Sequence, residues 1–253
     1  MSGHSKWSTI KRSKGVEDAK RGLTFTKVAN TITIVVRLSG SGDPESNPRL
    51  RAVLEEAKEV NMPKENIQRA IDRGLGKLPG QVLEEATYEG FGPGKVAFII
   101  ETVTDNRMRT LQLIKNAFER AGGSLVGQGA VSYMFEKKGE IKVLSKGGTK
   151  DDEMLELIDA GAEDVEDFED EGVLKYLVYT NPSSLFEVVN KINSAGYKTQ
   201  SQELVMKPNI LQQITDSEIA KKVLNFADIL EDNDDVQKVF ANFDIDDKLV
   251  QLS

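Results

Sequence analysis

The basic and aromatic side chains near the N-terminus are the residues of this sequence best suited to chemistry with a polyanion. The first 37 residues hold eight Lys and Arg against two acids, whereas the whole chain of 253 residues has a formal net charge of −8. Cations release counterions when they neutralise phosphates, and an aromatic ring stacks on bases. We therefore predict a nucleic-acid contact, with stacking by Trp7 and a phosphate or base contact by His4. The predicted phosphate contacts are Lys6, Lys11, Arg12, Lys14, Lys20, Arg21 and Lys27.

We call these nine residues the basic arm. RNA in particular offers splayed bases to a ring such as that of Trp7. The alternative is a solvated tail in which Trp7 docks on its own domain and His4 is inert.

A second pair of cations, Arg107 and Arg109, lies in the segment TDNRMRT at residues 104–110. We expect a strand to end and a helix to begin here, with one of residues 104–106 as the N-cap. Cations in a first helical turn oppose the helix dipole unless an anion binds nearby. Arg107 and Arg109 are therefore predicted as a secondary anion contact, with plain surface exposure as the alternative.

The residue types that most enzymes need are scarce. Cysteine is absent and His4 is the only histidine, so thiolate chemistry, disulfides and sulfur-ligated metals are excluded. A lone histidine completes neither a metal site nor a Ser–His–Asp triad. The glycine-rich run 90–95 departs from the phosphate-loop pattern at Glu89 and Val96 and is typical of a tight turn. We predict no catalytic residues, no metal and no cofactor.

Acidic side chains concentrate in the second half of the chain. Residues 151–171 hold twelve acids and no base, and six more aspartates follow between residues 232 and 247. A calcium loop counted from Asp232 fails, because Gln237 and Phe243 occupy the required glycine and glutamate positions. Solvated acidic faces are the simplest interpretation. A surface that binds a basic protein, or that mimics nucleic acid, is the alternative.

The elements that carry the basic arm form a small helical domain, residues 1–77. Apolar spacing over residues 22–38 is helical, although the β-branched run at 31–36 also alternates like a strand. A second helix is predicted after the cap Asn47, and a third between Pro63 and Gly74.

After a linker, strands and helices alternate, which predicts the fold class α+β. A strand at 95–102, a helix at 106–121 and a strand at 130–135 begin a middle α/β domain, which a helix at 216–230 and a strand at 234–241 complete. Between them, a βαββαβ order is typical of a ferredoxin-like unit. The domains predicted are 1–77, a discontinuous middle domain at 80–137 plus 207–253, and an inserted ferredoxin-like domain at 138–206. The elements predicted within the insert are strand 139–144, helix 151–161, strand 163–169, strand 173–179, helix 182–195 and strand 197–205.

No window approaches the length of a membrane span, and no apolar signal region follows the basic start. We therefore predict a cytoplasmic location and no membrane partner.

Several stretches together resemble the YebC/PmpR family, which includes the mitochondrial translational activator of cytochrome oxidase subunit I. Beyond about residue 140 the resemblance rests on length and element order. Because it begins at Gly3, the basic arm resembles a mature N-terminus rather than a cleaved presequence. Lys95 departs from the pattern, since a further glycine is expected there. The matching stretches are residues 2–22, 42–58, 61–71, 88–94, 104–110 and 132–139.

The resemblance implies a helical domain followed by two α/β domains, the last inserted into the middle one, and it settles residues 22–38 as a helix. It also implies a role in gene expression without enzymatic chemistry. The family carries a transcriptional-regulator label, with DNA binding for some members. Others resemble ribosome-acting factors that help the translation of difficult nascent sequences.

Two versions of this role differ in what they require of the chain. A DNA-binding regulator usually presents a helix to the major groove as a symmetric dimer, and no helix-turn-helix with base-reading side chains is evident. A ribosome-binding factor needs only a basic arm among rRNA or tRNA phosphates, while acidic domains point away or meet basic ribosomal proteins. We therefore favour a translation factor, with a regulator that binds duplex DNA as the alternative.

Overall fold

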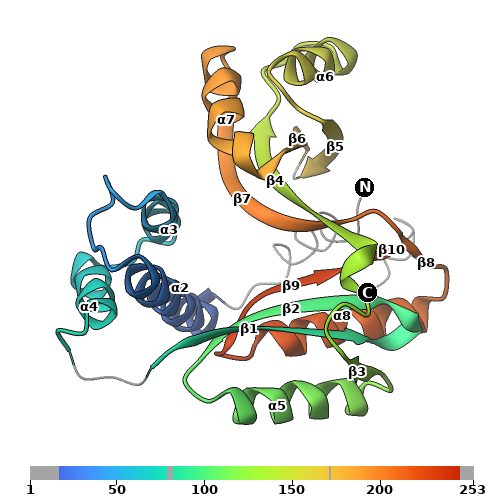
Figure 1. Ribbon diagram of the computed structural model, residues 1–253. Coiled ribbons are helices and arrows are strands. Elements are labelled where there is room, and N and C mark those ends of the chain that lie inside the picture. The colour runs from blue at the N-terminus through green and yellow to red at the C-terminus, as the bar shows by residue number, and fades with distance from the viewer. Residues whose placement is uncertain (1–16, 79–81, 171, 246–253) are drawn as a thin grey trace. The chain divides into compact units, whose positions relative to one another are not determined.

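The structure is a computed structural model that describes residues 17–78, 82–170 and 172–245, with residues 17–21 as backbone only. A helical region is followed by two sheet regions, which confirms the α+β class (Figure 1). Within the described residues, no helix is both long enough and apolar enough to cross a membrane. In chain order, the elements are α2 (Glu17–Ser39), α3 (Pro48–Glu59), α4 (Lys64–Gly74), β1 (Glu84–Phe91), η1 (Pro93–Lys95), β2 (Ala97–Thr104), α5 (Arg107–Arg120), β3 (Ser124–Val126), η2 (Ser132–Met134), β4 (Phe135–Leu144), α6 (Lys150–Asp159), β5 (Asp164–Asp170), β6 (Val173–Thr180), η3 (Pro182–Ser184), α7 (Leu185–Ser194), β7 (Lys198–Pro208), β8 (Gln212–Ile214), α8 (Ser217–Glu231), β9 (Val236–Ala241) and β10 (Phe243–Ile245).

The described residues divide into two compact units. The first comprises residues 17–130 with 221–239, and the second comprises residues 131–220 with 240–245. The chain leaves the first sheet, of order β3-β1-β2-β9, after β3 and returns to it with β9. The sheet of β4, β5, β6 and β7 is therefore an insertion in sequence. The predicted domain boundaries at residues 77, 138 and 206 stay a prediction.

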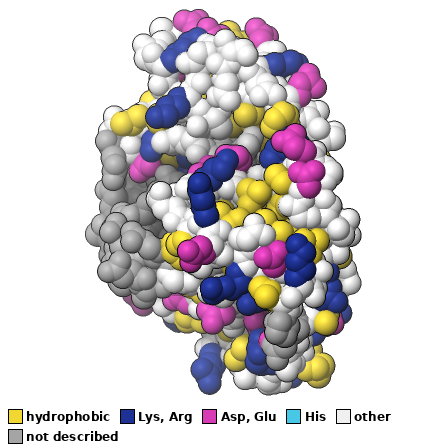
Figure 2. Space-filling view, turned by 90° about the vertical axis from the view of Figure 1, so that its left-hand side faces the viewer, with side chains coloured by type: hydrophobic (Ala, Val, Ile, Leu, Met, Phe, Trp, Pro, Cys, Tyr) yellow, Lys and Arg dark blue, Asp and Glu magenta, His cyan; other side chains and the backbone are white. Residues whose placement is uncertain are grey.

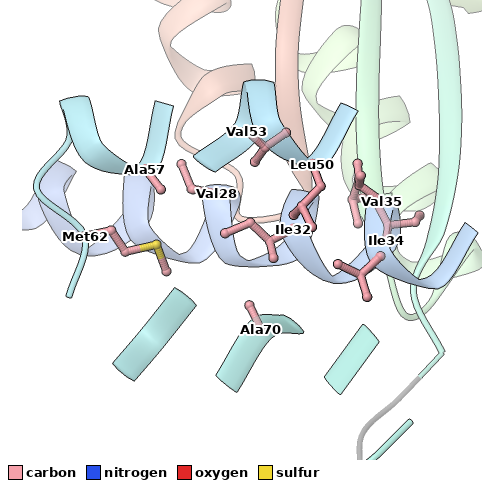
Figure 3. Close-up of a cluster of buried hydrophobic side chains, with 11 residues drawn as sticks. Val28, Ile32, Ile34, Val35, Leu50, Val53, Ala57, Met62 and Ala70 are labelled. Atoms are coloured by element: carbon pink, nitrogen blue, oxygen red, sulfur yellow. The ribbon is translucent and has the colours of Figure 1, made fainter. Parts of the chain in front are cut away.

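The helical region is built on α2. The run 31–36, which also alternates like a strand, lies inside this helix, so the helical interpretation is confirmed. Figure 3 shows α2 between Leu50 and Val53 of α3 on one side and Ala70 of α4 on the other, with Ile32 fully buried at the centre. Packing on two sides thus outweighs the β-propensity of the run.

Two local signals fix the neighbouring helices as predicted. The Asn47 side chain accepts a hydrogen bond from the Leu50 amide, at 3.1 Å, and so caps α3. Gly74 ends α4 where the helix touches α2, since a Cβ there would lie 2.6 Å from the Thr33 carbonyl oxygen and 2.8 Å from the Val36 Cβ. Only glycine permits this approach.

The first sheet differs from the prediction at three strands. β2 and α5 confirm the elements expected at 95–102 and 106–121, but no strand was expected at β1 or β3, and β1 pairs with β2 along its whole length. The strand predicted at 130–135 is wrong: turns and η2 occupy it until β4 begins at Phe135. Gly129 has a φ of 89° and donates its amide to the buried Glu89 carboxylate, which turns the chain there.

An aromatic cluster joins α5 and α8 to the first sheet. Phe118 and Phe226 pack edge to face at 4.9 Å, and Phe226 and Phe98 at 5.0 Å. Gly90 and Gly92 leave room for these rings, since a Cβ on either would lie within 2.6 Å of a ring carbon. Both helices therefore cover the same face of this sheet (Figure 1).

The tight turn predicted for the glycine-rich run is confirmed at η1. Gly94 has a φ of 66° and Lys95 a φ of 62°, both in the left-handed region. Such a backbone favours glycine, which gives a physical reason for the glycine expected at position 95.

The second unit confirms the ferredoxin-like order. Its strands follow the order β5-β6-β4-β7 with antiparallel pairing throughout, and α6 and α7 contribute to its core with Tyr176 and Val178. The ends of the insertion meet, because Phe135 pairs with Pro208. The parallel pair β8 and β10 was not predicted.

A buried carboxylate, Glu153 of α6, organises the loop that precedes this helix. It accepts hydrogen bonds from Ser145 Oγ and Tyr176 Oη at 2.7 Å, and from the amides of Lys146 and Gly148 at 2.9 and 3.0 Å. Burial raises the pKa of Glu153, but the four hydrogen bonds together outweigh burial and lower it. The side chain is 1% exposed and every contact favours its charged form.

We predict opposite effects for two Gly→Ala changes in helices. Gly74→Ala destabilises the helical region by about 1–3 kcal/mol, because its methyl meets backbone. Gly22→Ala, inside α2 with nothing within 4 Å, stabilises it by about 0.5–1 kcal/mol. Urea unfolding followed by far-UV circular dichroism measures both changes. Equal effects would contradict the close approach of α4 to α2.

We predict that Glu153→Gln weakens the second unit by about 1–3 kcal/mol at neutral pH. A lowered folded pKa gives stability that is present above the unfolded value of about 4.3 and is lost as the pH falls through the folded value. The difference between native chain and variant should therefore shrink on acidification. Hydrogen exchange of the β4–α6 segment, corrected for intrinsic rates at each pH, measures it. Asp159→Asn, an exposed change on the same helix, is the control.

Candidate nucleic-acid interface

The basic arm lies almost entirely outside the described side chains. His4, Lys6, Trp7, Lys11, Arg12 and Lys14 precede the described residues. Lys20 and Arg21 are described as backbone only, within the first turns of α2. The structure therefore describes the helix that follows the arm and leaves its predicted contacts as a prediction.

Lys27 is the one arm residue with a described side chain, and it has an intramolecular partner. Its half-buried ammonium donates to the backbone carbonyl of Glu231, the last residue of α8, at 2.5 Å. A cation is stabilising at a helix C-terminus. One turn later, the Thr31 hydroxyl donates to the Gln237 side chain at 3.0 Å. Lys27 thus helps to join α2 to the first sheet.

The helix α4 carries three exposed cations that the sequence analysis did not select. Lys64, Arg69 and Arg73 are exposed and have no ion pair within the described part of the chain. Other cations of the helical region are engaged: Arg49 with Glu85, Lys58 with Glu55 and Lys77 with Asp72. The missed signal was the spacing of Arg69 and Arg73, one helical turn apart on a helix with three cations and two acids.

Away from α4, charge in the helical region is mixed. Residues 22–63 and 75–78 hold six basic and five acidic side chains. Figure 2, which faces this region, shows Lys and Arg side chains interspersed with Asp and Glu side chains. The described helices therefore form no broad cationic face, and the densest positive charge of the chain belongs to the arm.

The segment 104–110 is organised around a carboxylate from a distant part of the chain. Asn106 caps α5, accepting from the Arg109 amide at 3.0 Å. The buried carboxylate of Asp235, before β9, accepts from the hydroxyls of Thr110 at 2.6 Å and Thr104 at 3.2 Å. Thr104 lies at the end of β2 and Thr110 in the first turns of α5, so Asp235 fixes how α5 starts relative to β2.

Arg109 belongs to this cluster. Its Nη2 atom donates to both Asp235 oxygens at 3.1 and 3.0 Å and forms an ion pair with Asp105 at 2.9 Å. The hydrogen bond to Asp235 raises the pKa of Arg109, so the guanidinium stays charged. Two internal carboxylates leave it little capacity for a further anion. The predicted anion contact stays a prediction for which this geometry offers no support at Arg109.

Arg107 is exposed and forms no ion pair within the described residues. Its backbone carbonyl accepts from the Tyr88 hydroxyl at 3.3 Å. Burial raises the pKa of Tyr88, and the nearby Arg107 guanidinium only partly offsets this. Of the two predicted arginines, Arg107 is the one available to a solvent anion.

A pocket of about 330 Å³ lies beside the Asp235 cluster. Three carboxylates and two guanidiniums line it, and one of these guanidiniums, that of Arg109, is already paired. This charge balance does not suit a phosphate. The lining residues are Thr26, Asn30, Arg73, Leu83, Val103, Asp105, Arg109, Asp234 and Asp235.

The acidic run 151–171 carries less unpaired negative charge than its sequence indicates. Lysines from neighbouring strands pair with much of it: Lys138 with Glu163, Lys207 with Asp164 and Glu166, and Lys175 with Asp170. Glu153 is buried. The solvated-face interpretation therefore holds for only part of the run. Among the described residues, no three His, Cys, Asp or Glu side chains are grouped to hold a metal.

Comparisons with known proteins cover nearly the whole chain. Residues 5–77 match the family model described as the TACO1/YebC protein N-terminal domain, and residues 83–243 match that of the TACO1/YebC second and third domain. A "probable transcriptional regulatory protein" of Sulfurihydrogenibium sp. is 48% identical over 99% of this chain and 98% of its own. One of Desulfotalea psychrophila is 47% identical over the same shares. The crystal structure of a conserved hypothetical protein, Aq1575 of Aquifex aeolicus, is similar with a TM-score of 0.81 and 42% identity, over 91% of this chain and 93% of that one.

We predict that Arg109 and Asp235 act as a coupled pair. Arg109→Ala and Asp235→Ala each destabilise the first unit, and the double variant loses less than the sum, with a coupling of about 0.5–3 kcal/mol. Arg107→Ala, two residues away, should add to Asp235→Ala without coupling. Hydrogen exchange of β2 and α5 measures the stability of the native chain and of the five variants. If the losses of stability for Arg109→Ala and Asp235→Ala simply add, the two side chains are not coupled, and the Arg109 guanidinium is free for another partner.

Proposed function

This chain belongs to the TACO1/YebC family, and on that basis we propose that it is a non-enzymatic regulator of gene expression that binds nucleic acid through its basic arm. The names of its relatives support regulation of gene expression. A cytoplasmic location, where both ribosomes and bacterial DNA are found, belongs to the same proposal.

The observation that carries the proposal is the segregation of charge along the chain. Residues 1–21 hold six Lys and Arg against two acids, and the remaining residues hold 27 against 39. A polyanion is attracted to the first segment and repelled by the rest. Contact is therefore confined to one end of the chain, with Trp7 available for stacking on a base.

The structure changes which side chains we propose as nucleic-acid contacts. Lys27 and Arg109 already have internal partners, so we leave them out. Lys64, Arg69 and Arg73 of α4 are exposed without ion pairs, and we add them, since α4 packs on the helix that the arm leads into. The proposed interface is the arm up to Arg21 together with these three cations of α4.

Within this proposal we favour RNA on the ribosome. An arm with cations at irregular spacing suits phosphates that follow an irregular path, and RNA presents such paths together with unstacked bases. The acidic remainder of the chain disfavours wrapping a long duplex, and it can face basic ribosomal proteins.

A DNA-binding transcriptional regulator is the second candidate. Its specific support is α4, a helix that carries Gln68 and three exposed cations without ion pairs among the described residues, together with the names of the relatives. In this version α4 would lie in the major groove and its side chains would read bases.

We predict that the full chain co-sediments with ribosomes in sucrose gradients and that Lys11→Ala/Arg12→Ala/Lys14→Ala weakens this binding strongly. Loss of three phosphate contacts should reduce the log–log salt slope by about 2, at about 0.7 per single-strand contact. Trp7→Ala tests stacking separately, with an expected loss of about 1–3 kcal/mol in binding free energy.

The matched control is Lys137→Ala/Lys198→Ala/Lys221→Ala, which removes three exposed cations elsewhere and should leave binding unchanged. Lys64→Ala/Arg69→Ala/Arg73→Ala should weaken binding in both versions, so the two candidates are separated by which nucleic acid the native chain binds. Sequence-selective duplex binding that depends on α4, without ribosome binding, would establish the transcriptional version. Binding to neither, or binding indifferent to salt, would reject the nucleic-acid proposal.

A further inference from the structure

A groove of about 650 Å³ lies between α5 and α8, within the first unit. From α5 it takes Leu113, Asn116, Ala117 and Arg120, and from α8 it takes Lys222, Asn225, Phe226 and Ile229. Each set follows the i, i+3, i+4, i+7 spacing that places four residues on one helix face. The groove is therefore a regular surface made of two facing helical stripes.

The two helices run in opposite directions along the groove. Asp235, four residues after the end of α8, binds Arg109 and Thr110 at the start of α5. The C-terminus of α8 thus lies beside the N-terminus of α5. Leu113 and Ile229 consequently share one end of the groove, and Arg120 and Lys222 share the other.

The end that holds Leu113 and Ile229 is apolar and open to solvent. Leu113 is 45% exposed and Ile229 51% exposed, whereas Ile114 and Phe226 form a buried floor between them and the opposite end. Large aliphatic side chains exposed together on facing helices are typical of a surface that receives an apolar group.

The other end is cationic. Arg120 and Lys222 are exposed and have no ion pair within the described residues, and no acid lines the groove. That absence stands out on a chain with 41 acidic residues against 33 basic ones. The charged end complements a carboxylate.

We propose that this groove binds a peptide segment of another protein, with a large apolar side chain at one end and an Asp or Glu at the other. The seven-residue separation of Leu113 and Arg120 along α5 corresponds to about 10 Å. A helical ligand meets it with an apolar residue and an acid about two turns apart. The proposal is independent of the nucleic-acid contact and uses none of its residues.

Two other occupants fit less well. Nucleic acid would gain only two cations and no exposed aromatic ring, because Phe226 is 1% exposed. A second copy of this chain would have to offer a different surface to the groove, and such heterologous contacts extend into filaments unless they close into a ring. A peptide of another protein needs neither an exposed aromatic ring in the groove nor the closure of copies into a ring.

Selection of random phage-displayed peptides on the full chain tests the proposal. We expect enriched peptides to share an apolar residue and an acid at a fixed spacing. A labelled synthetic copy of the most enriched peptide then serves as the probe in fluorescence polarisation. Leu113→Ser/Ile229→Ser and Arg120→Glu/Lys222→Glu should each weaken its binding at least about tenfold, equivalent to about 1.4 kcal/mol. Replacing the probe's acid by lysine should restore binding to the charge-reversed chain.

Matched controls lie on the same helices outside the groove. Met108→Ser, at 73% exposure, and Lys115→Glu/Lys221→Glu should leave the affinity unchanged. The proposal fails if the groove variants bind the probe as the native chain does, or if the enriched peptides are basic. It also fails if the groove variants alter only self-association in sedimentation, or only RNA binding.

Discussion

The buried carboxylate of Asp235 is the interaction on which the first unit depends. Thr104, Arg109 and Thr110 all hydrogen-bond to it, and its backbone carbonyl accepts from the Val103 amide at 2.8 Å. One residue thus fixes the end of β2, the start of α5 and the entry to β9. The same contact places the C-terminus of α8 beside the N-terminus of α5, so it also fixes which ends of the two helices meet along the groove. Removing a partner here would leave a desolvated charge, which costs more than the hydrogen bond itself contributes.

The elements that the sequence predicts correctly are those fixed by interactions between residues close along the chain. Helix periodicity, the Asn47 cap and the glycine at the end of α4 identified the helical region, and alternation of strands and helices identified the ferredoxin-like insert. β1 was missed because Gly90 within it and Gly92 just after it leave room for rings from α5, β2 and α8, and no local pattern reports such packing. Asp235 was grouped with solvated acids for a similar reason, since its partner Arg109 lies 126 residues away. Side-chain partners at that separation have no periodic signature.

Charge acts differently in the basic arm and in the elements that the structure describes. The arm concentrates cations along a short stretch of chain, whereas the described elements pair many of theirs, as Lys138, Lys175 and Lys207 pair with the acidic run. Such pairing lowers the local field without lowering the net negative charge of the chain. Attraction of a polyanion then depends on the cations left unpaired, and α4 joins the arm in the proposal because it holds three of them and packs on the helix that the arm leads into. Sequence counts alone show net charge and conceal this difference.

The insertion of one sheet within another has a consequence for folding during synthesis. A growing chain exposes β1, β2 and α5 long before β9 and Asp235 leave the ribosome, so the first sheet lacks an edge strand during that interval. Once the insert has folded, Phe135 and Pro208 pair at its two ends. This pairing shortens the effective loop between β3 and α8 and lowers the entropy cost of closing it. Early folding of the insert would therefore shorten the effective path that β9 must search. β9 thus completes the first sheet only after the whole insert has been synthesised.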